Sequence, residues 1–194
     1  MRQNTLAKQK ITSSLYSCEK DAELIIKKLF VESQPYSDEL KKLLVVNTKD
    51  CLDDPNKNYQ KLVEKISVKD LIEGNYITLS PKLNIKEHEE IKSYVILSFD
   101  NFIPNATNPQ FRDCNVFFDI FCHPDYWDLG NFRLRPIKIA GIIDGLLNGS
   151  RLTGIGTFQF AGMTEIISND QLAGYTLSFA AIHGNDDNIP PDVR

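Results

Sequence analysis

The fold is decided by residues 111–183. Near the start of this stretch lies the run CNVFFDIFC at Cys114–Cys122. This is the most apolar run of strand length in the chain, so it predicts the central strand of a sheet. Pro136 suits the first turn of a helix that follows it, and Asn148-Gly149 suits the end of that helix. The apolar residues that recur at helical spacing, and so predict the core-facing stripe of this helix, are Ile139, Ile142, Ile143, Leu146 and Leu147.

Further strands and an N-terminal helix complete the pattern. Helical spacing predicts a helix over Ser17–Glu32, ahead of the first strand. The predicted strands, joined by hairpin-type links, are Tyr76–Leu79, Ile91–Phe102, Cys114–Cys122, Thr157–Ile167 and Tyr175–His183. This order predicts an α+β fold: a mostly antiparallel sheet of four to five strands with helices packed on one face, plus a helical insertion.

The chain is expected to form a single α+β domain at 17–183, with a helical insertion at about 35–75. Within that insertion, Ser67-Val68-Lys69-Asp70 has the shape of a capping box, and Gly74 suits the end of the short helix that it starts. An N-terminal arm at 1–16 is basic, and a C-terminal tail at 184–194 carries Asp186 and Asp187. These two ends are either frayed or become ordered against a neighbouring subunit.

The composition sets limits on the class of protein. With 194 residues, 42% of them hydrophobic and 25% charged, the chain suits one soluble domain that needs neither disulfide nor metal. A net charge of −4 argues against a protein that coats DNA. Met1–Ser14 lacks the apolar segment of a signal peptide, and no run approaches membrane-spanning length. We therefore expect a protein that stays in the cytoplasm and off membranes, with its four cysteines as free thiols.

Two kinds of reaction centre can be tested against the residues. Cys122-His123 suggests a cysteine nucleophile, but adjacent strand residues point to opposite faces and no Gly-rich elbow flanks this pair. His123, Asp125, Asp128 and His183 could gather as metal ligands, yet none of the three histidines stands in HxH, HExxH or HxxxH spacing. The simpler interpretation is a buried structural cysteine, with histidines that hydrogen-bond backbone groups at strand ends. We predict no catalytic residue, no metal and no cofactor.

Two segments are candidates for contacts with other proteins. The connector 103–113 is longer than hairpin geometry requires, which makes it either an ordinary surface loop or a protruding contact loop. The segment Tyr126–Arg135 combines Tyr, Trp and Arg, the types enriched at interface hot spots, although Trp127 could equally cap its own core. The predicted contact residues, including two in the tail, are Asn105, Asn108, Phe111, Arg112, Tyr126, Trp127, Arg133, Arg135, Asp186 and Asp187.

The order of the elements resembles the tail terminator (tail completion) and head–tail joining proteins of long-tailed bacteriophages. The resemblance lies in an N-terminal helix, two strands joined by a long hairpin loop, one helix and a closing strand pair. The residues that carry it after the first helix are Ile91–Phe102, Cys114–Cys122, Pro136–Leu147, Thr157–Ile167 and Tyr175–His183. It covers the first helix and about residues 76–183, whereas the stretch 35–75 departs from the compact members of that group.

The resemblance implies a structural virion protein that forms a ring of identical subunits, usually six, at the head-proximal end of the tail. Such a ring stops tube polymerisation, and its partners are copies of itself, the tail tube protein and the head connector. DNA would only pass through the lumen, where an acidic balance avoids sticking. Three alternatives stay open: another neck or head-completion protein, a monomeric adaptor, and a small cytoplasmic hydrolase that uses Cys122, His123 or His183.

Overall fold

The structure is a computed structural model, and it describes residues 18–53, 55, 58–79, 92–107, 112–152, 155–169 and 172–183. Its helical elements are α1 (Cys18–Lys27), the π-helical turn η2 (Lys28–Glu32), α2 (Tyr36–Val45), α3 (Asn58–Val63), α4 (Val68–Glu73), the 3-10 turn η4 (Pro124–Tyr126) and α5 (Arg135–Leu147). Its strands are β1 (Ile77–Thr78), β2 (Tyr94–Pro104), β3 (Arg112–Cys122), β4 (Arg151–Leu152), β5 (Ile155–Thr157), β6 (Gln159–Asn169) and β7 (Leu172–His183).

These strands form one sheet in the order β1-β2-β3-β7-β5-β4, and β6 also pairs with β7. The long strands β2, β3, β7 and β6 pair antiparallel in that order, whereas the short β1 runs parallel to β2. The predicted α+β class with a mostly antiparallel sheet is therefore confirmed. The short strands β4 and β5 were not predicted. Phe158 separates β5 from β6 within what the sequence pattern indicates as one strand from Thr157 to Ile167, because its backbone pairs with Gly149 and Ser150.

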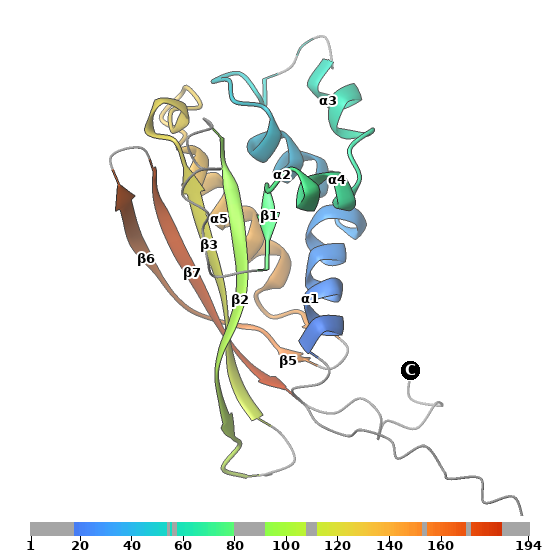
Figure 1. Ribbon diagram of the computed structural model, residues 1–194, viewed down its shortest axis with the longest axis vertical. Helices are drawn as coiled ribbons and strands as arrows, with labels where there is room; N and C mark the ends of the chain where they lie inside the picture. Colours follow the sequence, from blue (N-terminus) through green and yellow to red (C-terminus); the bar gives the residue numbers. More distant parts are fainter. Residues whose placement is uncertain are drawn as a thin grey trace, which may run out of the picture.

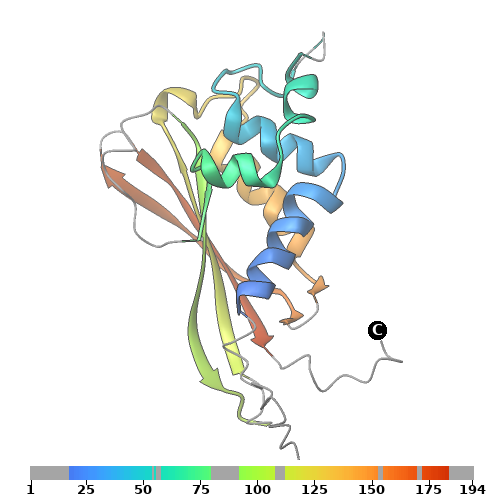
Figure 2. The same cartoon turned by 45° about the vertical axis from the view of Figure 1, so that its right-hand side comes forward.

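Helices α1, α2 and α5 cover one face of the sheet, as Figures 1 and 2 show. The predicted stripe of α5 faces this core, since Ile139 and Ile143 are fully buried there together with Phe118 of β3 and Leu177 of β7. Burying one such side chain contributes about 1.5–3 kcal/mol, which is offset in part by the entropy of ordering the chain. The main core thus lies between the sheet and the helices.

The stretch 35–75 is helical, as predicted, and two of its helices contribute to the main core: α2 and, through the fully buried Leu71, α4. Leu40, Leu43 and Leu44 of α2 are fully buried in the same cluster as the sheet residues. The capping box is confirmed, because the Ser67 hydroxyl accepts from the Asp70 amide while the Asp70 carboxylate accepts from the Ser67 amide. Such caps contribute about 1 kcal/mol each to helix stability. α2 is therefore a part of the helix layer that the sheet needs for its cover.

The hairpin between β2 and β3 is more regular than predicted. β2 runs as far as Pro104 and β3 begins at Arg112, and these two residues are paired. Residues 105–111 alone lie between the strands, so the predicted connector 103–113 is corrected at both ends. The ladder continues past an irregularity between Asp100 and Ile103, where Asn101 has a φ of 60°. Asn tolerates this left-handed conformation, which lets the strand resume after the bulge.

Candidate functional site

The turn between η4 and α5 holds one aromatic side chain entirely in solvent. Gly130, Asn131 and Phe132 have φ values of 75°, 51° and 61°, so that three residues in a row are left-handed. The turn is held by the Asp128 carboxylate, which accepts from the Gly130 amide at 2.7 Å, and by the bridge between Asp128 and Leu134. Gly and Asn suit this conformation, whereas it is strained for Phe. The turn therefore holds Phe132 in a costly geometry, in which its side chain is fully exposed.

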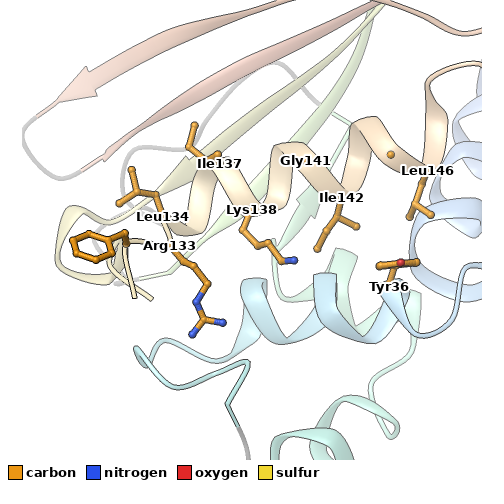
Figure 3. A pocket seen from close by; sticks show the side chains of 10 residues that line it. Tyr36, Arg133, Leu134, Ile137, Lys138, Gly141, Ile142 and Leu146 are labelled. Carbon is orange, nitrogen blue, oxygen red and sulfur yellow. The ribbon is translucent and has the colours of Figure 1, made fainter. Parts of the chain in front are cut away.

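Beside this turn lies an open groove of about 540 Å³ along α5, bounded on its other side by the first residue of α2 (Figure 3). Its lining residues are mostly apolar: Tyr36, Phe132, Arg133, Leu134, Ile137, Lys138, Gly141, Ile142, Gly145 and Leu146. A Cβ atom added at Gly141 or Gly145 would meet no atom within 4 Å. Two glycines four residues apart on a helix leave room for a close neighbour, and that room stays open among the residues that the structure describes.

The basic residues at the rim of the groove are paired within the chain. The Arg133 guanidinium contacts the Asp53 carboxylate, and the Lys138 ammonium lies 2.9 Å from a Glu39 carboxylate oxygen. Each pair is partly exposed, so it contributes at most about 1 kcal/mol. Together they attach α2 and the loop after it to α5. They also neutralise the basic side chains at the start of this helix, which makes an acidic or nucleic-acid ligand a poor match for the rim.

Arg135 is fully buried, so its predicted place on an exposed contact surface is wrong. Its Nε donates to the carbonyl of Tyr126 at 2.8 Å. Its Nη1 donates to the carbonyls of Leu43 and Val46 at 2.6 and 3.0 Å, and its Nη2 donates to that of Thr48 at 2.7 Å. The guanidinium thus satisfies carbonyls at the C-terminal end of α2, where the helix dipole favours a cation.

Trp127 faces its own domain, which was one of the two interpretations left open by the sequence. Its indole Nε1 donates to the Cys122 carbonyl at 3.0 Å, and its ring lies 6.3 Å from that of Tyr175 and packs against the core. Tyr126 is half-buried, with its ring 6.2 Å from that of His123. The exposed aromatic of the segment is therefore Phe132, which is not among the predicted contact residues. The pair Gly130-Asn131 was the available signal, because both residues favour left-handed turns.

The remaining predicted contact residues lie around the β2–β3 hairpin and in the tail. The Asn105 amide nitrogen donates to the Asp113 carboxylate at 2.8 Å, and its oxygen accepts from the Thr107 amide at 3.0 Å. Arg112 is half-buried at the start of β3, opposite Pro104 and His183. Asn105 therefore stabilises the end of the hairpin, and its role in contacts stays a prediction. Asn108, Phe111, Asp186 and Asp187 lie outside the described residues.

Cys122 is poorly suited to act as a nucleophile. It is fully buried, and this burial raises the pKa of its thiol to about 12. The neighbouring His123 accepts a hydrogen bond from the Asp125 amide at 3.3 Å through Nδ1, as predicted for a histidine at a strand end. No group of three or more His, Cys, Asp or Glu residues able to hold a metal ion is present in the described part of the chain.

The buried Cys122 thiol should make stability fall in alkali. It stays neutral in the folded protein but ionises near its ordinary pKa of 9 when the chain unfolds. The contribution of this thiol to the free energy of unfolding is therefore complete below pH 9. It is lost as pH rises toward 12, at up to about 1.4 kcal/mol per pH unit. Urea titrations of the wild type and Cys122→Ala between pH 8 and 10.5 would measure this, with a shallower fall expected in the variant. Equal slopes would show that the thiol already ionises in the folded state.

The fold and the surface define a class: a small α+β protein whose most distinctive exposed feature is an open apolar groove beside a fully exposed phenylalanine. The chain belongs to the YomW family, whose model matches residues 37–181. That match runs from α2 into β7, so the helical stretch before the sheet is part of the family's domain. No curated protein and no solved structure matches the chain. Within the described residues, no helix is long and apolar enough to cross a membrane.

Proposed function

We propose that this chain is a structural protein of a bacteriophage virion. It forms a ring at the head-proximal end of the tail, caps the tail tube and joins it to the head connector. The element order supports this proposal: a first helix, the hairpin β2–β3, the helix α5 and the closing hairpin β6–β7 follow the pattern that resembles tail terminator proteins. The fold alone does not assign a function, and the surface of α5 supplies the second line of support.

The observation that carries the proposal is the fully exposed Phe132 beside the open apolar groove on α5. Contiguous apolar surface of this kind marks contacts with other proteins, and aromatic side chains are common anchors there. A ring needs two different surfaces on each subunit that fit one another and close. In our proposal Phe132 and the groove form one of these surfaces, and the β2–β3 hairpin contributes to the contact with a neighbour.

The alternatives differ in what the surface would bind. A neck or head-completion protein would use the same groove but bind the head connector and leave the ends of tail tubes free. The hydrolase that uses Cys122 is disfavoured by the burial and raised pKa of that thiol. Binding to purified tail tubes, compared with binding to purified connector, separates the first two. Capped tubes of fixed length support the terminator, and binding to the connector alone would contradict it.

Phe132→Asn is expected to abolish assembly while leaving the fold intact. Asn tolerates the left-handed conformation at position 132, so the variant relieves backbone strain and removes only an exposed side chain. Truncating an aromatic anchor typically weakens association by about 2 kcal/mol or more, which is roughly 30-fold. Light scattering over a concentration series measures the association. Ile72→Asn, on the exposed side of α4, is the matched control. If both variants assemble as the wild type does, the groove is not the contact surface.

A further inference from the structure

The edge of the sheet at β6 is open beyond Phe160, whose amide donates to the Asn148 side chain at 3.2 Å. β6 pairs with β7 through residues 159–169, and no described strand pairs with its other edge. Its side chains are exposed on both faces of the sheet from Gln159 to Ile167, apart from the half-buried Gly162 and Ile166. An open edge presents a row of backbone donors and acceptors to any strand that approaches it. β6 is therefore a surface on which another strand can be added.

The open edge of β6 carries few of the features that normally block strand addition. Its irregularities lie near its two ends, between Phe160 and Gly162 and between Ile167 and Asn169, so the central residues 162–167 are regular. These six residues include no proline and no lysine, and Glu165 is their one charge. Charges, prolines and bulges are the usual protection of an edge. The centre of β6 has little of this protection.

The opposite edge of the same sheet provides a comparison within the molecule. β1 pairs with β2 at Val95 and Ile96 alone, which leaves the rest of the outer edge of β2 without a described neighbour. That edge has an irregularity after Asp100, a left-handed Asn101 and a proline at its end, Pro104. The centre of the β6 edge is thus less protected against strand addition than the edge of β2 is. The difference points to β6 as the edge that meets a partner.

The helix layer stops short of β6 and leaves an apolar shelf beside α5. The pairing with β7 sets Phe160 opposite the buried Phe179, Met163 opposite the buried Leu177 and Ile167 opposite Ala173, on the helix-covered side. Yet these three side chains are 47%, 41% and 74% exposed. Figure 3 shows Leu134, directly before α5, and Ile137 of α5 on the side of the helix that is turned toward the sheet. The shelf is therefore an exposed surface formed by these three apolar side chains and flanked by α5. Glu165, opposite Tyr175, lies on the same face between Met163 and Ile167.

We propose that β6 pairs antiparallel with β6 of a second copy of this chain, about a two-fold axis near Met163. Such an axis is perpendicular to the sheet, so the two sheets join into one continuous sheet. The two α5 helices then lie on the same face of this sheet, on either side of the two paired shelves. The shelf has few charges, so two chains of net charge −4 meet there without facing like charges, and an axis near Met163 sets the two Glu165 carboxylates apart.

This contact goes beyond the proposed ring, because it is a two-fold contact between identical surfaces, whereas a ring closes through two different surfaces. The assembly should therefore contain an even number of subunits, as pairs or as two joined rings. Met163→Lys places a charge on the shelf and should weaken the pair at least about tenfold, halving the mass of the assembly in solution. Leu62→Lys, which changes an exposed leucine of α3, is the matched control and should leave the mass unchanged.

Cross-linking tests the pairing itself. In a Cys18→Ser background, Met163→Cys should give a covalent dimer with a short thiol cross-linker, because residues opposite each other across antiparallel strands lie about 5 Å apart. The remaining cysteines Cys51, Cys114 and Cys122 are buried. Ile72→Cys, at an exposed position on α4, should give no covalent dimer in the same experiment. No covalent dimer at position 163 would overturn the proposal.

The outcomes separate this proposal from the ring. If Met163→Lys keeps the mass of the wild type while Phe132→Asn loses it, the ring stands and the β6 pairing is wrong. A plain dimer that Met163→Lys dissociates supports the pairing and contradicts the ring. If Met163→Lys assembles with itself normally but no longer binds the tail tube protein, the edge belongs to that partner and the pairing is wrong. A wild type that stays monomeric at all concentrations contradicts both.

Discussion

Arg135→Met is expected to lower the free energy of unfolding by about 3–5 kcal/mol. The guanidinium donates to the carbonyls of four residues. Two of these, Leu43 in α2 and Val46 directly after it, lie 92 and 89 positions away in sequence. Met fills much of the same volume but leaves these buried carbonyls without a donor. The loss should therefore come from unpaired backbone groups between α2 and α5, with little contribution from a cavity.

Urea denaturation followed by circular dichroism measures this loss, together with a fall in Tm of roughly 6–20 °C for a domain of this size. Arg135→Lys is the informative companion, because Lys keeps the charge but cannot present the planar fork that reaches all four carbonyls. It should lose less stability than Met. Lys138→Met breaks a partly exposed ion pair and should cost less than about 1 kcal/mol. If Arg135→Met costs no more than Lys138→Met, the docking role of Arg135 is wrong.

Gly174→Ala is expected to destabilise the sheet by about 3 kcal/mol or more, although it adds a single methyl group. Gly174 of β7 lies opposite Phe121 of the central strand β3. A Cβ atom there would overlap the backbone carbonyl of Ile120 and lie 3.2 Å from the Cα atom of Phe121. Because these obstacles are backbone atoms of the neighbouring strand, no side-chain rotation relieves the overlap. The two central strands must separate locally.

Gly162→Ala provides the matched control for this variant, since it makes the same change in the adjacent strand β6. There the added Cβ atom would meet only the Ser178 hydroxyl, at an ordinary 3.7 Å. We expect its free energy of unfolding to stay within about 0.5 kcal/mol of the wild type. Hydrogen exchange of the β3 and β7 amides should be faster in Gly174→Ala and unchanged in Gly162→Ala. Equal stability of the two variants would mean that the strands do not approach as closely as described.

The sequence was sufficient for the class of fold because the decisive signals are local and periodic. The apolar run at Cys114–Cys122, the stripe on α5 and the capping box at Ser67 each predict an element from neighbouring residues alone. The ends of the long strands were less predictable. Phe158 belongs by type to a strand, but its backbone exchanges hydrogen bonds with Gly149 and Ser150, so it lies between the end of β5 and the start of β6.

The candidate site was less predictable, because it depends on contacts between segments far apart in the chain. Arg135 at a helix start, beside Arg133 and Lys138, has the composition of a solvated end. Its burial is decided by the carbonyls of Leu43, Val46 and Thr48, which no local pattern connects to it. Trp127 was ambiguous for the same reason. Phe132 was missed because its exposure follows from three left-handed residues in succession, and only the first two have types that favour that conformation.

The most direct test of the proposed function is the mass of the purified protein in solution, by light scattering and native mass spectrometry, alone and with tail tube protein. The proposal predicts a closed assembly of several copies that binds the ends of tail tubes and stops their growth, and that Phe132→Asn disrupts. A protein that stays monomeric at every concentration and never associates with tube protein would contradict it.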